Sequence, residues 1–219
     1  ARIYKTDGRF FLSKAKDNAK DQSYFLYGIS PDKLPNLVLP LGDLTKEQVR
    51  AIAAEANLPV AEKPESMELC FAGEGDYRAV LTGALASQPG DITDMQGNKI
   101  AEHKGIANFT LGQRRGVGFA GGKPLYVGRI DAEKNTIALG TKEEVSSRTV
   151  SANQLNVLIP EELVAGAQFF GKIRSYAARP LGGDSHPCRL TEVNEEAMTV
   201  EFDQPQFAPC PGQRLVLYN

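Results

Sequence analysis

No tryptophan occurs among the 219 residues, and there are only two histidines and three cysteines. The odd number of cysteines and the absence of any Cys-x-x-Cys pair exclude a disulfide scaffold and argue against a zinc site. His103 and His186 also stand apart from any Asp, Glu or Cys array with metal-ligand spacing. We therefore expect structural histidines, free thiols and no bound metal.

The sequence has no apolar run approaching the ~18 residues that a membrane helix needs, and it has no secretory signal. We expect a cytoplasmic protein with no membrane partner. Its first residue is Ala1 rather than Met, which suggests a piece of a longer polypeptide. A hydrophobic content of 42% allows a buried core, in one large domain or in roughly two or three small ones.

The net charge of −2 shows none of the basic excess that is typical of nucleic-acid-binding proteins. Charge is unevenly distributed, however. The segment 103–123 contains lysines and arginines but no carboxylate, whereas the segment 43–68 is rich in acids. Local basic surfaces are therefore compatible with the sequence.

Two helices are predicted in the first part of the chain. Thr45, with Gln48 three residues later, is a capping-box start, and apolar residues recur at helical spacing up to Asn57. This pattern predicts a helix over 45–57. A second apolar face predicts another helix over 76–85.

Strands dominate elsewhere. Asp7-Gly8 tolerates the positive φ of a hairpin turn and separates two short strands, at 2–5 and 9–16. After Pro89-Gly90, glycine turns separate short alternating runs, as a small barrel or curled sheet requires. We expect the strands of this part near 125–130, 136–139, 153–159, 167–176, 187–193, 197–203 and 213–218, with a link at 144–150.

Lys20, Asp21 and Gln22 place a cation, an anion and an amide directly before aromatic residues. One interpretation is a local helix entrance, in which Asp21 caps and Gln22 bonds to the backbone. The functional interpretation is that Lys20 meets a phosphate while Gln22 offers a donor and an acceptor to a base edge. Composition alone favours the first.

Cys70 lies between a strand-like apolar step and a glycine turn. A cysteine in such a position is most often a small buried hydrophobe. A strand that ends at two glycines can also leave the sulfur at a surface cleft, where a thiolate acts as a nucleophile. The residues alone leave both interpretations open.

Two further stretches combine cations with residue types that bind RNA. Arg114 and its neighbour Arg115 lie in a glycine-rich stretch without a Gly-Lys-Ser/Thr or Gly-x-Gly-x-x-Gly pattern, which argues against a nucleotide site. RNA contact and plain solvent exposure are equally compatible with Arg114. Period-two alternation places Lys172, Arg174 and Tyr176 on one strand face, which suits phosphate pairing and base stacking but also a solvated edge strand.

In their order, these segments resemble the tRNA-specific 2-thiouridylases (MnmA/TrmU family), and the likeness runs along the whole chain. It is carried by short blocks: Ala1-Arg2-Ile3 with Ala15-Lys16-Asp17, Lys20–Leu26, Leu39-Pro40-Leu41-Gly42 with Lys46–Ala53, Cys70-Phe71 with Gly75-Asp76-Tyr77, Thr110–Arg114, Tyr126-Val127 and Pro211-Gly212-Gln213. Chance agreement of so many ordered blocks is remote.

The resemblance implies an α+β, β-rich fold: a short α/β remnant of a PP-loop domain at 1–72, a small mostly-β middle domain at 73–143, and a C-terminal antiparallel β-barrel at 144–219. It also implies a sulfurtransferase that converts the wobble uridine of tRNA to 2-thiouridine by ATP-dependent adenylation and persulfide transfer. The implied partners are the tRNA anticodon stem-loop and a sulfur-donor protein, and no DNA.

Matched to the family's motifs, Cys70 is the persulfide-carrying or disulfide-resolving cysteine. The family's tRNA contacts fall on Lys20, Asp21, Gln22, Arg174 and Gln213, and Arg114 is a weaker candidate. At the family's arginine-tyrosine pair, Ser175 follows Arg174, and Tyr176 comes one residue later.

The SGGxDS loop that binds ATP in that family, and the family's first cysteine, are absent from this sequence. We therefore expect no cofactor in this chain and no thiolation by the chain alone. A stand-alone, non-catalytic tRNA- or RNA-binding module is the alternative, and a β-rich interaction domain without an RNA partner is a third.

Overall fold

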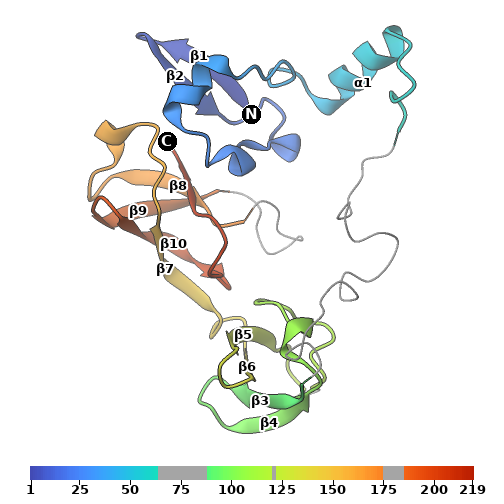
Figure 1. Ribbon diagram of the computed structural model, residues 1–219, viewed down its shortest axis with the longest axis vertical. Helices are drawn as coiled ribbons and strands as arrows, with labels where there is room; N and C mark the ends of the chain where they lie inside the picture. The colour runs from blue at the N-terminus through green and yellow to red at the C-terminus, as the bar shows by residue number, and fades with distance from the viewer. Residues whose placement is uncertain (64–87, 120–121, 175–184) are drawn as a thin grey trace. The chain divides into compact units, whose positions relative to one another are not determined.

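The computed structural model describes residues 1–63, 88–119, 122–174 and 185–219 of the chain (Figure 1). The chain forms two compact units. The terminal unit, named here because it holds both ends of the chain, comprises residues 1–65, 149–204 and 213–219; the middle unit comprises 66–148 and 205–212. No helix in the described ranges is long and apolar enough to cross a membrane.

A two-stranded antiparallel hairpin opens the terminal unit, with β1 (Arg2–Thr6) paired to β2 (Arg9–Ser13). Asp7 and Gly8 adopt positive φ values of 50° and 80°, the geometry of a two-residue hairpin turn. The predicted hairpin is therefore confirmed. The second strand is shorter than predicted, and the Lys16 amide donates to the Gly42 carbonyl beyond its end.

The helix predicted over 45–57 is present as α1 (Lys46–Glu55), and both hydrogen bonds of its capping box form. The Thr45 hydroxyl accepts from the Gln48 amide at 3.3 Å, and the Gln48 side chain accepts from the Thr45 amide at 2.8 Å. No residue of α1 is buried, and Ile52 on its apolar face is 51% exposed. The described part of the chain thus does not cover this face. The helix predicted over 76–85 lies outside the described residues.

The larger sheet has five strands, in the order β11-β8-β9-β10-β7. They are β7 (Ser146–Asn153), β8 (Gln168–Lys172), β9 (His186–Val193), β10 (Ala197–Phe207) and β11 (Val216–Tyr218). Alternate residues of β9 and β10 form its core, with Leu190, Val200 and Phe202 fully buried. The prediction of a β-rich chain with few helices is confirmed. Closure of this sheet into a barrel stays a prediction.

The position of β7 corrects the predicted strand at 153–159. The strand lies in the segment expected to be a link, because Val150 and Ala152 alternate onto the core within an otherwise polar sequence. The apolar residues after Asn153 belong to no strand, although Leu155 still packs against the core. Hydrophobic runs thus mislocated the strand.

The middle unit contains a four-stranded sheet in the order β4-β3-β6-β5. Its strands are β3 (Gly90–Asp94), β4 (Lys99–His103), β5 (Tyr126–Asp131) and β6 (Thr136–Gly140). β3 pairs parallel with β6, and the other pairs are antiparallel. Ile92, Val127 and Ile137 are fully buried between them. The strands predicted near 125–130 and 136–139 are confirmed.

Gly171 of β8 leaves room for the ring of Phe202, and we predict that Gly171→Ala destabilises the terminal unit. A Cβ at this position would lie 2.7 Å from the Phe202 ring and 3.0 Å from the Cys188 sulfur. Such overpacking costs about 1–3 kcal/mol. Differential scanning calorimetry should show a lower midpoint for the terminal unit.

Gly28→Ala is the matched control for this substitution. Gly28 belongs to the same unit, and a Cβ added there would meet no atom within 4 Å, so its replacement should leave the midpoint essentially unchanged. Equal midpoints for the two variants would contradict the packing argument.

Candidate nucleic-acid interface

Lys20, Asp21 and Gln22 form the bend between two short 3-10 helices, η1 (Asn18–Lys20) and η2 (Ser23–Leu26). Asp17 caps the first of them, since its carboxylate accepts from the Ala19 amide at 3.0 Å. Lys20 and Gln22 are exposed, whereas Asp21 between them is only partly exposed. The side chains of Lys20 and Gln22 are therefore exposed at the bend, and the carboxylate of Asp21 points into the protein.

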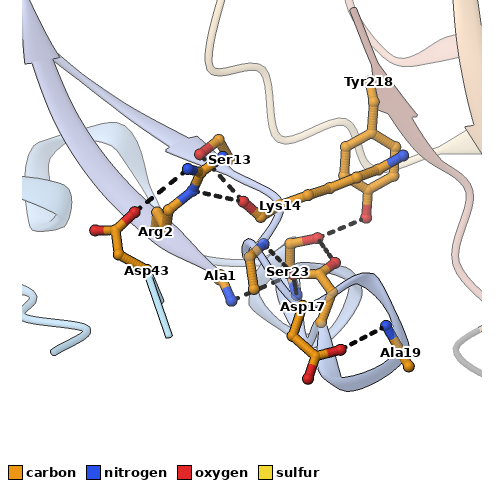
Figure 2. A network of polar contacts seen from close by, with 11 residues as sticks. Ala1, Arg2, Ser13, Lys14, Asp17, Ala19, Ser23, Asp43 and Tyr218 are labelled. Atoms are coloured by element: carbon orange, nitrogen blue, oxygen red, sulfur yellow. Dashed lines mark hydrogen bonds and ion pairs between the residues drawn. The ribbon is translucent and has the colours of Figure 1, made fainter. Parts of the chain in front are cut away.

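The carboxylate of Asp21 accepts several internal hydrogen bonds. They belong to a polar network in which Figure 2 labels Ala1, Ser23 and Tyr218. One oxygen accepts from the Ala15 amide at 2.8 Å and from the Ser23 amide at 3.3 Å, and the other accepts from the Ser23 hydroxyl. The Ala1 nitrogen lies 3.2 Å away, and the side chain of Asp21 is 5% exposed. Its acceptor capacity is thus used within the protein, which suits positioning of the bend better than direct contact with RNA.

The same network extends to the last strand of the larger sheet. The Tyr218 hydroxyl lies 3.0 Å from the Ser23 hydroxyl, and because the Ser23 proton goes to Asp21, Tyr218 is the donor. Burial raises the pKa of Tyr218, and the negative charge of Asp21 acts in the same direction, so the phenol keeps its proton. The Lys14 ammonium stacks on the Tyr218 ring, 4.2 Å from its centroid.

Tyr24, two residues after the bend, also makes long-range contacts. Its hydroxyl donates to the Arg214 carbonyl at 2.9 Å and accepts from the Arg214 amide at 3.2 Å. The Ile173 carbonyl lies 3.4 Å from the same oxygen. Tyr24 is only 5% exposed, so these bonds are formed out of contact with bulk water.

Tyr24 therefore brings together three of the predicted contact segments within the terminal unit. Gln22 lies two residues before Tyr24, Gln213 directly precedes Arg214, and Arg174 directly follows Ile173. Gln213 is exposed, and Arg174 is half-buried.

Two further cations lie against the aromatic rings of this region. The Lys172 ammonium lies 5.9 Å from the centroid of the Tyr24 ring, and the Arg214 guanidinium lies 4.9 Å from that of the Tyr27 ring. The Arg214 Nε also donates to the Tyr27 hydroxyl. Burial raises the pKa of Tyr24, and the positive charges of Arg214 and Arg174 oppose that rise. The surroundings of Tyr24 are therefore electropositive, although the whole chain carries a net charge of −2.

Part of the strand-face argument for Lys172, Arg174 and Tyr176 needs correction. β8 ends at Lys172, so Arg174 lies beyond the strand and period-two alternation does not place it. Ser175 and Tyr176 lie outside the described residues. Arg174 instead follows Ile173, whose carbonyl lies 3.4 Å from the Tyr24 hydroxyl.

Arg114 belongs to the middle unit, where it is exposed. It lines a hollow of about 330 Å³ together with residues of the same loop region, namely Val117, Phe119, Gly122, Lys123, Pro124 and Leu125. The two cations of this hollow suit an anion.

Cys70 lies outside the described residues. The two other thiols have distinct surroundings: Cys188 is buried in the core of the larger sheet, and Cys210 is partly exposed. Burial raises the pKa of the Cys188 thiol to about 11, so it stays protonated and unreactive at neutral pH.

The described residues do not fit the phosphates of a nucleotide. Gly112, Gly116 and Gly118 have positive φ, but no helix follows them whose N-terminus would face an anion. At the start of α1 the amides of Thr45 and Gln48 are paired in the capping box, and the Lys46 amide donates to Asp17. No group of three or more potential metal ligands occurs in these ranges either.

Comparison with known proteins assigns all three parts of the chain. Residues 1–74 match the tRNA methyl transferase HUP domain, residues 78–141 the tRNA methyl transferase PRC-barrel domain, and residues 147–219 the aminomethyltransferase beta-barrel domain. The tRNA-specific 2-thiouridylase MnmA of Moorella thermoacetica is 40% identical over 217 residues, 98% of this chain and 59% of that protein. The chain belongs to the tRNA-specific 2-thiouridylase family.

Two other 2-thiouridylases are as similar. That of Acetivibrio thermocellus is 40% identical over 96% of this chain and 58% of its own length. That of Carboxydothermus hydrogenoformans is 40% identical over 99% of this chain and 59% of its own length. The chain thus spans a little under three-fifths of these relatives.

Sequence reasoning missed the residue at the centre of this candidate interface. The sequence predicts only packing for Tyr24 and assigns no role to Arg214. The one signal is position: Tyr24 lies inside the matched block Lys20–Leu26, and Arg214 directly follows Pro211-Gly212-Gln213.

The hydrogen bonds of Asp21 make the stability of the terminal unit sensitive to acid. Burial alone raises the pKa of Asp21, but the hydrogen bonds from Ser23 and Ala15 outweigh it and hold the pKa below its ordinary value. The carboxylate's contribution is therefore fully present above about pH 4 and is lost as the pH falls through the lowered pKa. We predict that Asp21→Asn lowers the thermal midpoint at pH 7 and that this deficit shrinks toward pH 3.

Asp43→Asn is the control for charge removal in the same unit, because the side chain of Asp43 is 81% exposed and its ion pair among the described residues is with Arg2, across 3.3 Å. Circular dichroism melts at several pH values compare the variants. A pH-independent deficit for Asp21→Asn would contradict an ionised, hydrogen-bonded carboxylate.

Proposed function

We propose that the chain is the tRNA-gripping part of a tRNA 2-thiouridylase, and that Lys20, Gln22, Arg174 and Gln213 contact the anticodon stem-loop. One observation carries the proposal: Tyr24 joins the segments that bear Gln22, Arg174 and Gln213 within one unit. These side chains include cations for phosphate oxygens and amides for base edges. Asp21 holds the bend that presents the first two.

The relatives' names supply the reaction class, a sulfur transfer to tRNA uridine. We propose that adenylation of the uridine by ATP takes place on a segment outside these 219 residues, since the described residues do not fit nucleotide phosphates. The chain alone is then inactive in thiolation. The HUP-domain match of residues 1–74 supports a nucleotide-binding neighbour.

We propose Cys70 as the cysteine of this chain that carries the transferred sulfur as a persulfide, or that releases it by forming a disulfide. Its support is the family resemblance of the block around it. The buried position of Cys188 in the sheet core removes that thiol as a competitor. A sulfur-donor protein would load the persulfide.

A stand-alone RNA-binding module is the second candidate function. The absence of a phosphate cradle in the described residues favours it, whereas the greater length of the relatives favours the thiouridylase. Thiolation by the protein as encoded in the genome separates the two, because an RNA-binding module without chemistry leaves uridine unmodified.

We predict that Arg174→Ala weakens binding of tRNA by the 219-residue chain and makes it less dependent on salt. Loss of one phosphate contact should lower the slope of log affinity against log salt concentration by about 0.9 for duplex-like RNA. Filter binding or fluorescence anisotropy at several salt concentrations measures both quantities.

Arg189→Ala is the charge-matched control, because Arg189 is exposed on β9 and alternates with core residues on the opposite face. Its removal should leave the salt slope nearly unchanged. If Arg174→Ala and Arg189→Ala behave alike, Arg174 makes no specific contact.

In the complete protein, we predict that Cys70→Ser abolishes thiolation while tRNA affinity stays at the wild-type value. The hydroxyl of serine can neither carry a persulfide nor form a disulfide. Thiolated tRNA is separated from unmodified tRNA on mercury-containing gels. Cys210→Ser is the control and should thiolate normally, and full activity of Cys70→Ser would remove Cys70 from the mechanism.

A further inference from the structure

Tyr24 is the one described side chain whose hydroxyl reaches the backbone beside both Arg174 and Gln213. It bonds the amide and the carbonyl of Arg214, the residue after Gln213, at 3.2 and 2.9 Å. The carbonyl that precedes Arg174 lies 3.4 Å from the same oxygen. Tyr24 itself follows Gln22 by two residues, on the first turn of η2.

Burial shows how Tyr24 acts. Because Tyr24 is only 5% exposed, its hydroxyl cannot reach a nucleic acid. Gln22 and Gln213, which lie near it, are exposed. Any influence of Tyr24 on RNA must therefore pass through its neighbours. Phenylalanine would fill the same space but would leave the Arg214 amide and carbonyl without this partner.

We propose that Tyr24 is a positioning residue for tRNA binding, whose hydroxyl fixes Gln22, Arg174 and Gln213 relative to one another so that together they contact one stretch of the RNA. The inference rests on the proposed function and deepens it, because it names the group that assembles the contacts. Hydrogen bonds weaken steeply as distance and angle depart from their optimum, so contacts from separate segments need such a common anchor.

A second contact, with Tyr27, holds the side chain of Arg214. The Arg214 guanidinium lies over the Tyr27 ring, 4.9 Å from its centroid, and Nε donates to the Tyr27 hydroxyl. Tyr27 is 39% exposed. The side chain of Arg214 is thereby held on the outer side while its backbone is held by Tyr24.

The test is Tyr24→Phe in the 219-residue chain, with tRNA binding measured across a series of salt concentrations. We expect affinity to fall about five- to tenfold, because the variant loses both hydrogen bonds to the Arg214 backbone. The salt slope should also become shallower by about one contact, because a displaced Arg174 no longer meets its phosphate. Tyr4→Phe, at an exposed hairpin position, is the matched control and should change neither value.

A double-mutant cycle with Arg174→Ala separates positioning from general stabilisation. If Tyr24 acts through Arg174, the effect of Tyr24→Phe on affinity shrinks in the Arg174→Ala background. A merely structural role would lower the thermal midpoint but leave the two effects on affinity additive and the salt slope unchanged. Additive effects with a wild-type slope would overturn the proposal.

If Tyr24→Phe unfolds the chain, tRNA binding is measured with Tyr27→Phe instead. Because Tyr27 is partly exposed, its replacement removes one hydrogen bond to Arg214 without opening the core, and we expect a smaller loss of affinity, about two- to fivefold. Wild-type affinity and slope for this variant would then overturn the proposal.

Different results would contradict the proposed function and the positioning role of Tyr24. If the wild-type chain shows no salt-dependent tRNA binding, the proposed function fails. If the wild-type chain binds and Tyr24→Phe binds identically, the positioning role alone fails and the contacts of Arg174 and Gln213 stand.

Discussion

The hydroxyl of Tyr24 forms hydrogen bonds with two backbone groups of Arg214 that lie outside the sheet. Arg214 precedes β11, which begins at Val216, so its amide and carbonyl lie outside that strand's ladder. One tyrosine hydroxyl, as donor and acceptor, pairs both groups. This pairing ties residues 190 positions apart in sequence, and the rest of the candidate interface depends on it.

The neighbouring carboxylate explains why the bend can present its polar residues at all. A buried anion is tolerated only where donors surround it, and Asp21 receives them from Ala15 and Ser23. Ser23 in turn receives the proton of Tyr218, from the last strand. Asp21 and Tyr24 therefore attach one short segment to β11 and its approach at two points, which fixes both its place and its orientation.

The sequence predicted the elements whose signals are local. The hairpin at Asp7-Gly8 and the capping box of α1 are both confirmed, because turn chemistry and helix capping involve residues within a few positions of one another. β7 was misplaced because its core-facing residues, Val150 and Ala152, are too few and too small to make a hydrophobic run. The motif residues of the candidate interface came from resemblance, since neither charge nor periodicity distinguishes Gln213 from an ordinary turn residue.

The sequence could not reveal the contact between Tyr24 and the Arg214 backbone. A tyrosine hydroxyl that bonds backbone groups leaves no complementary side chain to recognise at the other end, so no pattern links Tyr24 to Arg214. The same reason limits what net charge can predict. Lys172, Arg174 and Arg214 gather near Tyr24 through backbone and ring contacts, and they make a local positive surrounding in a chain whose net charge is −2. This local concentration of positive charge is therefore a property of the fold's long-range contacts, not of its composition.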